Sequence, residues 1–390
     1  MRILYFCNVH RLIPTESGVI KKVLAQCNVL SESGHEVLLA CPDDNSGVYR
    51  IIDKNGFSLT TIGDSYNKQK LKESQLLNYL FEYIMDHHIA AIYSRYSNYS
   101  VALSSFYNRL RRKHVRVLLE VPTYPISQRW TSVRQNLKAR NYIKALKQVY
   151  NSTIGSLGIL FFRKSVDRIV NNNGFDSIWG VPTLKISNGV DVSSIPPKSD
   201  NMEKEKSEVN IIAVANVAHW HGYDRIIRGL SEYYKEFKQT KVYFNIVGPG
   251  EEIVHLKELT NRLKLQNYVS FKGVLTGQDL DNAFNAADIG ISVLGAHRNK
   301  MKRYDSLKSR EYCARCLPFV TEDLEYQYSD CPFVLCVHSD ESSIDIMSIL
   351  SFYSNVSSMQ DLRSIMRNYA INKCDWRVAF IPVVDYLRSE

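Results

Sequence analysis

A lysine and a glutamate three residues apart make the segment 306–320 (SLKSREYCARCLPFV) the part of the chain best suited to chemistry. On a helix, Lys308 and Glu311 would share one face near an N-terminus whose free N–H groups attract anions. Ser306 or Ser309 could cap that terminus. A cation and an acid held there suit a nucleotide diphosphate and its ribose hydroxyls. The alternative is an ordinary surface salt bridge, which the pair alone would favour.

Glu120 is a second candidate, because it is the only acidic residue between residues 87 and 166. It ends an apolar segment with the composition of a buried strand, and the prolines after it fix an extended loop that carries Tyr124. Glu120 could orient an acceptor hydroxyl or accept its proton, with Arg95 and Tyr124 as further acceptor contacts. A structural salt bridge between Glu120 and Arg95 explains the same residues equally well.

The basic residues of the chain are concentrated in its first half. The net charge of the whole chain is +9, whereas residues 1–200 alone carry +11 and the remainder −2. The basic residues of the acid-poor stretch are Arg95, Arg109, Arg111, Arg112, Lys113, Arg116, Arg129, Arg134, Lys138, Arg140, Lys144, Lys147, Arg163 and Lys164. Such a field attracts anionic lipid, nucleic acid or a diphosphate substrate, and a solvated face without a partner is the weaker alternative. We expect a glycan or a lipid-diphosphate as the acceptor, of which the latter would match this charge, and no nucleic-acid partner.

The composition and the apolar runs indicate a globular protein of the cytoplasm. The longest apolar runs, such as 157–162, are too short to span a bilayer, and the start at residues 1–6 is a first strand rather than a signal peptide. Eight scattered cysteines in such a chain favour reduced thiols. The pair Cys313 and Cys316 has no second ligand pair, so we expect no zinc or redox site there.

Strand-like and helix-like segments alternate along the chain, which predicts two α/β domains. Residues 2–8, 18–33 and 36–41 form a first βαβ unit, and residues 79–85, 90–94, 101–110 and 115–120 continue it. A second alternating series begins at residue 209. We predict an N-terminal acceptor-side domain over 1–192, a linker over 193–207, a nucleotide-sugar-binding domain over 208–372, and a C-terminal helix within 373–390 that returns to the first domain.

Four segments, in the right order, resemble a known family. They are Glu16–Val37 (ESGVIKKVLAQCNVLSESGHEV), Ile186–Asp191 (ISNGVD), Asn245–Glu252 (NIVGPGEE) and the segment LKSREYCARCLPFV. Together they resemble the retaining glycosyltransferases of family 4, and the resemblance extends from Met1 to the final helix. It implies the GT-B fold, two Rossmann-like domains facing a cleft, and transfer of a sugar from a nucleoside diphosphate-sugar.

The resemblance also implies roles for individual residues. Gly18, before the first helix, would let backbone N–H groups approach the diphosphate, and Gly248 would pass under the nucleotide base; each is otherwise a loop or turn glycine. Glu311 would hold the ribose hydroxyls, and Lys308 would face the donor. The same resemblance implies that no protein nucleophile is used and that the leaving phosphate assists deprotonation of the acceptor.

The chain departs from the family pattern at three positions. A second glutamate of the family is replaced by Arg303, and Asp305 could supply the missing carboxylate. Two basic residues that bind the leaving diphosphate are replaced by Asn216 and His221. The charge could then come from a protonated His221, from Arg225 or from Arg310. A packed aromatic-imidazole turn at His219-Trp220-His221 is the alternative.

The segment Arg129–Lys147 mixes aromatic and aliphatic residues with cations, as in a helix that lies on an anionic membrane surface. The alternative is a basic helix packed on its own domain. Because the GT-B enzymes of this family are metal-independent, the resemblance implies neither a metal nor another cofactor beside the sugar-nucleotide. We therefore expect a hexosyltransferase of cell-surface polysaccharide synthesis, peripheral at the inner membrane face. The alternatives are a catalytically weakened binding protein of the same fold or a nucleotide-sugar epimerase.

Overall fold

The computed structural model divides the chain into two compact α/β units. It describes residues 1–13, 17–44, 48–53, 55–62, 72–96, 98–122, 124, 141–143, 146, 149, 153, 157–172, 174–199, 208–236, 239–299 and 304–389. Unit 1 comprises Met1–Ser187 and Ala379–Glu390, and unit 2 comprises Asn188–Val378. The predicted basic helix Arg129–Lys147, apart from a few isolated residues, and Arg303 lie outside the described residues.

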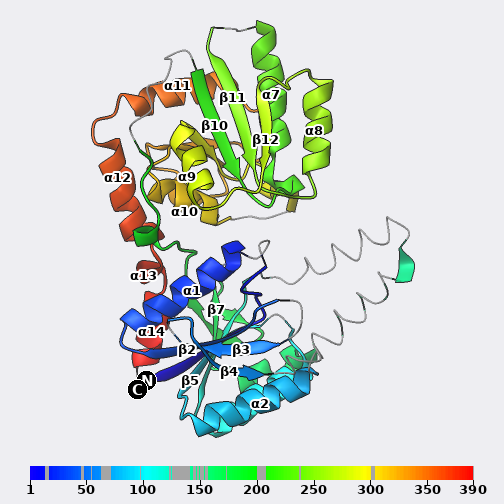
Figure 1. Cartoon of the computed structure of the whole chain (residues 1–390), viewed down its shortest axis with the longest axis vertical. Helices are drawn as coiled ribbons and strands as arrows, with labels where there is room; N and C mark the ends of the chain where they lie inside the picture. Colours follow the sequence, from blue (N-terminus) through cyan, green and yellow to red (C-terminus); the bar gives the residue numbers. More distant parts are fainter. Residues whose placement is uncertain are drawn as a thin grey trace. The chain divides into compact units, whose positions relative to one another are not determined.

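Unit 1 is built on a nine-stranded sheet in the order β4-β3-β2-β1-β5-β6-β7-β9-β8 (Figure 1). The main strands are parallel, and the edge strands β3, β4 and β8 pair antiparallel. The elements are β1 (Arg2–Cys7), α1 (Ser17–Glu32), β2 (Glu36–Pro42), β3 (Tyr49–Ile52), β4 (Ser58–Ile62), α2 (Glu73–Asp86), β5 (Ala91–Arg95), α3 (Val101–Arg112), β6 (Arg116–Glu120), η3 (Leu157–Phe161), α6 (Phe162–Ser165), β7 (Arg168–Asn171), β8 (Ser177–Ile178), β9 (Val181–Lys185) and α14 (Ile381–Arg388).

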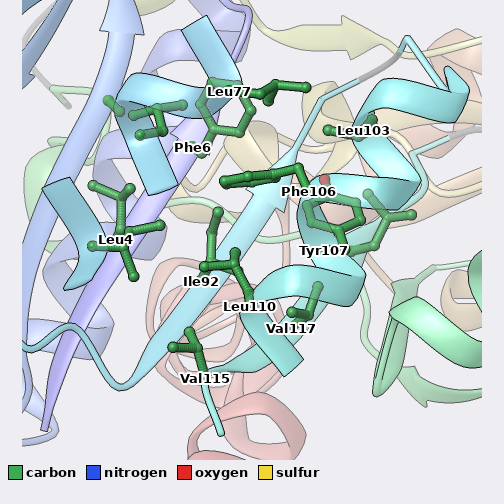
Figure 2. Packing of buried hydrophobic residues seen from close by; sticks show 14 of the residues in the cluster. Leu4, Phe6, Leu77, Ile92, Leu103, Phe106, Tyr107, Leu110, Val115 and Val117 are labelled. Atoms are coloured by element: carbon green, nitrogen blue, oxygen red, sulfur yellow. The ribbon is translucent and has the colours of Figure 1, made fainter. Parts of the chain in front are cut away.

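The central strands of unit 1, β2, β1, β5, β6 and β7, are buried on both faces, which explains their nearly continuous apolar composition. Leu4 and Phe6 of β1 pack against α2 and α3, and the ring of Phe106 lies among them (Figure 2). Tyr5, which points to the opposite face, donates a hydrogen bond to Gln26 of α1 over 2.6 Å. The β3–β4 hairpin is absent from our sequence prediction, because its strands are short and polar residues interrupt their alternation.

Unit 2 has a six-stranded, all-parallel sheet in the order β12-β11-β10-β13-β14-β15 (Figure 1). One face is covered by α7, α8 and α11, and the other by α9, α10 and α12. The elements are η4 (Val192–Ser194), β10 (Glu208–Val214), η5 (His219–His221), α7 (Tyr223–Glu236), β11 (Lys241–Val247), α8 (Ile253–Arg262), β12 (Val269–Gly273), α9 (Gly277–Ala286), β13 (Ile289–Ile291), η6 (Ala296–Asn299), α10 (Leu307–Ala314), β14 (Phe319–Glu322), η7 (Tyr326–Tyr328), β15 (Val334–Val337), α11 (Ile346–Ser357), α12 (Leu362–Tyr369) and η8 (Ala370–Cys374).

The border between the units falls after Ser187, earlier than the predicted residue 192. The turn at Asn188 belongs to unit 2, because its backbone N–H and its side-chain amide donate to Asp305 over 2.9 and 2.7 Å. Residues 193–199 of the predicted linker also lie on unit 2, where the Lys198 N–H donates to the Arg315 carbonyl over 2.8 Å. The rest of that linker lies outside the described residues.

The predicted terminal helix over Trp376–Leu387 is two short helices instead of one. α13 (Trp376–Ala379) ends before Phe380, and α14 begins at Ile381 with a proline in its first turn. A proline is accepted at the start of a helix but breaks a continuous one. The segment Ala379–Glu390 belongs to unit 1.

Candidate active site

In unit 2, the order in which strands are added to the sheet reverses between β10 and β13. The loops that follow these two strands meet at this point. The Leu294 N–H donates to the His221 carbonyl over 3.0 Å, and a side chain on Gly222 would collide with the Leu294 backbone. Ligands of open α/β sheets bind outside the carboxyl ends of the strands at such a switch point. Topology alone therefore places a candidate site at these loops and at the start of α10.

The N-terminus of α10 carries a lysine without a partner. Ser306 caps the helix by accepting the Lys308 N–H over 3.2 Å, which confirms one of the two predicted caps. The Lys308 side chain is half-buried, and in the part of the chain that the structure describes its ammonium makes neither a hydrogen bond nor an ion pair. Burial lowers the pKa of Lys308 to about 8, although the buried carboxylate of Glu325 opposes that shift. A cation that lacks a protein partner is available for an anionic ligand.

The buried carboxylate of Glu325 stabilises the start of α10. It is 1% exposed and accepts hydrogen bonds from the Ser306 N–H over 2.7 Å and from the hydroxyls of Ser309 and Thr321 over 2.5 Å each. Burial raises the pKa of Glu325, and these donors offset the rise only in part. The side chain fixes the first turn of α10 and adds negative potential near Lys308.

His221 is neutral in this structure. Its Nδ1 accepts the Ala218 N–H over 2.9 Å, so the remaining proton of the neutral ring is on Nε2. Burial, and then the nearby charge of Lys308, hold the pKa of His221 well below its ordinary value. The prediction that a protonated His221 replaces a missing cation is therefore wrong. The ring can still donate one hydrogen bond through Nε2, and it stacks on Tyr223 at 5.4 Å between ring centroids.

Arg225 and Arg310 are structural, which contradicts their predicted contacts with the donor. Arg225 is 1% exposed and donates to the carbonyls of Leu294 and Ser342 over 2.6 and 2.7 Å. Its remaining amino group donates to His338 and Asp340. Arg310 is 4% exposed and pairs with Asp305, with 2.7 Å between its terminal nitrogen and the carboxylate. Both guanidinium groups are occupied by acceptors inside the fold. Among His221, Arg225, Arg310 and Lys308, only Lys308 therefore keeps a positive charge that is available to a diphosphate.

Glu311 does not pair with Lys308, so the surface salt bridge considered as an alternative is absent from the described residues. Its carboxylate accepts from the Nε of Arg315 over 3.0 Å, and the side chain is 31% exposed. Arg315 also forms an ion pair with Asp281, with 2.8 Å between its Nη1 and the carboxylate oxygen. Glu311 is thus oriented by a neighbour one turn along α10 and keeps free acceptor capacity, as a contact to vicinal hydroxyls requires.

Gly248 is required by packing within unit 2 itself. Its φ is +113°, and an added Cβ would lie 1.9 Å from the Ala215 carbonyl oxygen. Gly250 is similarly close to Val217. These glycines hold the loop after β11 against the loop after β10, so they do not by themselves indicate a nucleotide.

Ion pairs of Arg298 hold the loop after β13 in place. Arg298 contacts both carboxylate oxygens of Asp224 over 2.8 and 3.0 Å and both of Glu341 over 2.8 and 2.6 Å. It also donates to the His219 carbonyl over 2.7 Å, and so links η6 to the turn that carries His221. Bidentate contacts of this kind fix orientation as well as distance.

In unit 1, Glu120 lies at the carboxyl end of β6 in a buried cluster. Lys22 of α1 contacts its Oε1 at 2.9 Å, Arg95 contacts the same oxygen, and the Tyr93 hydroxyl donates to Oε2 over 2.7 Å. Burial would raise the pKa of Glu120, but Arg95 and Lys22 outweigh burial and hold it at about 2. The ion pair with Arg95 is confirmed. A carboxylate of such low basicity and with this many donors does not suit a general base.

Gly18 and Tyr124 are the other two residues of unit 1 that were predicted to bind substrate. Gly18 is exposed in the first turn of α1, and a Cβ added there would meet nothing within 4 Å. The fold of unit 1 itself therefore does not demand glycine. Tyr124 packs edge-on against Phe175 and Trp179, with ring centroids 5.0 and 5.9 Å away, so its ring has a structural role.

Solved structures of glycosyltransferases share this fold over their full length. A glycosyltransferase from Rickettsia africae ESF-5 has a TM-score of 0.64 at 15% identity, covering 100% of this chain and 99% of that one. The chain has the GT-B fold. Sucrose-phosphate synthase from Thermosynechococcus elongatus scores 0.66 at 13% identity, covering 100% and 98%. Anabaena HepE in complex with UDP scores 0.63 at 12% identity, covering 100% of both chains. No family model and no curated protein sequence matches the chain.

Three residues near Glu120 and near the start of α10 were not predicted from the sequence. Lys22 and Gln26 lie one and two turns into α1 after Gly18, and only folding brings them to Glu120. Glu325 lies three residues after the end of β14, and a carboxylate shortly after a buried parallel strand is a usable signal. In the described residues there is no cluster of three or more metal-binding side chains, and no helix long and apolar enough to cross a bilayer.

Proposed function

We propose that this chain is a retaining glycosyltransferase of family 4. It transfers a hexosyl group from a nucleoside diphosphate-sugar to a glycan or lipid-linked acceptor in cell-surface polysaccharide synthesis. The observation that carries the proposal is Lys308 at the start of α10, which has no partner among the described residues and lies at the switch point of a parallel sheet. The solved complex of HepE with UDP, which has the same fold, supports a nucleotide as the ligand.

In the proposed donor complex, Lys308 and the free N–H groups of α10 contact the diphosphate. Neutral His221 donates a hydrogen bond through Nε2, and Glu311 accepts from the ribose hydroxyls. The bond from the anomeric carbon to the phosphate oxygen breaks while a bond to the acceptor oxygen forms on the same face. The acceptor proton passes to the departing diphosphate, so no protein base is needed.

The charge that neutralises the leaving diphosphate is proposed to come from Lys308 rather than from a metal ion. Glu120 has a positioning role in this scheme, because it holds Arg95 and Lys22 together at the carboxyl edge of the first sheet. We further propose that the protein acts in the cytoplasm at the inner membrane face, where the segment Arg129–Lys147 would meet anionic lipid.

The test measures binding of UDP, GDP, dTDP and their sugars by calorimetry, together with hydrolysis of each donor. Removing the ammonium in Lys308→Met should weaken nucleotide binding by about ten- to a hundredfold, the worth of a charge-assisted hydrogen bond. Lys272→Met is the matched control, because Lys272 is an exposed residue of β12. Its nucleotide affinity should equal that of the wild type.

A second candidate function is a binding protein of the same fold without turnover. It is favoured by the state of three basic side chains: His221 is neutral, and both Arg225 and Arg310 are used inside the fold. Nucleotide affinity that depends on Lys308, without hydrolysis or transfer of any sugar, would select this candidate. A wild-type protein that binds no nucleotide refutes both.

A further inference from the structure

Three large apolar side chains are exposed together on one short segment of unit 1. In η3, Leu160 is 75% exposed, Phe161 51% and Leu157 42%. The next residue, Phe162, is completely buried in the core between Tyr99 and Tyr107. Isolated exposed apolar residues are ordinary, but a contiguous group of large ones marks a contact surface.

The segment is held firmly in place. At its start, Gly158 lies so close to the first turn of α3 that an added Cβ would be 2.0 Å from the Ser100 carbonyl oxygen. At its end, Arg111 of α3 donates to the Lys164 carbonyl over 2.5 Å. The segment η3–α6 therefore runs along α3 from its first turn to its last. Its apolar side chains are exposed from an anchored backbone rather than from a frayed end.

The charge beside these side chains is positive. Arg163 and Lys164 follow directly in α6 and are exposed, as are Arg112 and Lys113 at the end of α3. The nearest acid in the chain, Asp167, is already paired with Arg111 at 2.7 Å. Apolar side chains bordered by cations that have no acidic partner among the described residues match a surface with phosphate groups outside and acyl chains beneath.

We propose that the surface formed by Leu157, Leu160, Phe161, Arg163 and Lys164 docks on an anionic phospholipid bilayer. Leu160 and Phe161 enter the boundary between headgroups and acyl chains, and the two cations of α6 contact lipid phosphates. The proposal rests on described residues alone and is independent of the segment Arg129–Lys147. It is also independent of sugar transfer, so nucleotide binding and membrane binding can fail separately.

The test is sedimentation of the full chain with phosphatidylcholine vesicles, with and without phosphatidylglycerol. The wild type should bind only the anionic vesicles, and added salt should release it. Leu160→Ser with Phe161→Ser should weaken binding at least about tenfold. The matched control is Phe57→Ser with Leu59→Ser, which removes two exposed apolar residues beside and within β4 of the same unit. Each of Arg163→Gln and Lys164→Gln should cost about fivefold at low salt.

Nucleotide affinity and melting temperature are measured on the same proteins and should not change in the Leu160 and Phe161 variant. Three outcomes overturn the proposal. One is no binding to anionic vesicles at low salt. Another is an equal loss of binding in the Phe57 and Leu59 control. The third is a concentration-dependent dimer in ultracentrifugation that the Leu160 and Phe161 substitutions dissociate, because this would make a second copy of the chain the occupant.

Discussion

Replacing Glu120 by glutamine tests the electrostatic account of the buried cluster in unit 1. Glutamine has nearly the shape of the glutamic acid side chain and stands in for its protonated form. The substitution leaves two nearly buried cations without their counter-charge, since the side chains of Lys22 and Arg95 are only 8% and 13% exposed. Breaking a buried pair from one side is destabilising, because the remaining charge stays out of water.

The size of the effect follows from the pKa of Glu120. A fall from the ordinary value of 4.5 to about 2 corresponds to about 3 kcal/mol of folding stability near neutral pH. Measured costs of breaking buried ion pairs, about 3 to 5 kcal/mol, agree with that figure. In a unit of this size the loss should lower the melting temperature by about 7 to 14 °C.

The pH dependence of the loss separates charge from packing. Because the folded pKa of Glu120 lies below the unfolded one, its stabilisation is complete above the unfolded value. It is lost as the pH falls from 4.5 towards 2. The difference between wild type and Glu120→Gln should therefore shrink from about 3 kcal/mol near pH 7 to about 2 kcal/mol near pH 3.5.

Urea unfolding followed by circular dichroism measures this difference, and hydrogen exchange in β5 and β6 assigns it to unit 1. Asp176→Asn is the control, because it makes the same charge change in an exposed pair with Lys185, where solvent screens the interaction and the stability should hardly change. A loss for Glu120→Gln as small as that of the control refutes the buried ion pair. A large loss that is the same at both pH values would instead point to packing.

Three further outcomes are expected. Nucleotide affinity should fall as the pH rises through about 8, since the cationic form of Lys308 binds the anion, and Lys308→Arg should abolish this fall in a calorimetric titration. Arg298→Lys should cost unit 2 about 2 kcal/mol in urea unfolding, because a lysine cannot make two bidentate contacts; an unchanged midpoint would contradict the network. Gly248→Ala should cost at least about 2 kcal/mol, owing to its positive φ and the contact with Ala215, whereas Gly18→Ala should leave the melting temperature unchanged or slightly raised.

Much of the fold could be predicted from local patterns. The apolar strands and the first βαβ unit follow from composition and periodicity, and residue type limited the cap of α10 to Ser306 or Ser309, of which the structure has Ser306. The β3–β4 hairpin was not predicted, because short edge strands carry a weak pattern. The division of the terminal helix at Phe380 depended on a proline whose effect was overlooked.

The candidate site was predictable only in part. Lys308 and Glu311 were found from their spacing, although their relation was not, since Glu311 pairs with Arg315. Arg225 was predicted to be available, but its acceptors lie 69 to 117 residues away along the chain. No local pattern predicts such contacts.

The sequence by itself determined the residue types, the alternation of strands and helices, and the order of the segments that resemble glycosyltransferases. Only the tertiary structure decided which charges remain available. The guanidinium groups of Arg310 and Arg225 are occupied by acceptors within the fold, and the imidazole of His221 is neutral. Lys308 is left without a counter-charge among the described residues. The physical reason is that desolvation and charge interactions depend on burial and on distances of a few ångströms. Those distances are set by segments that are remote from one another in the chain.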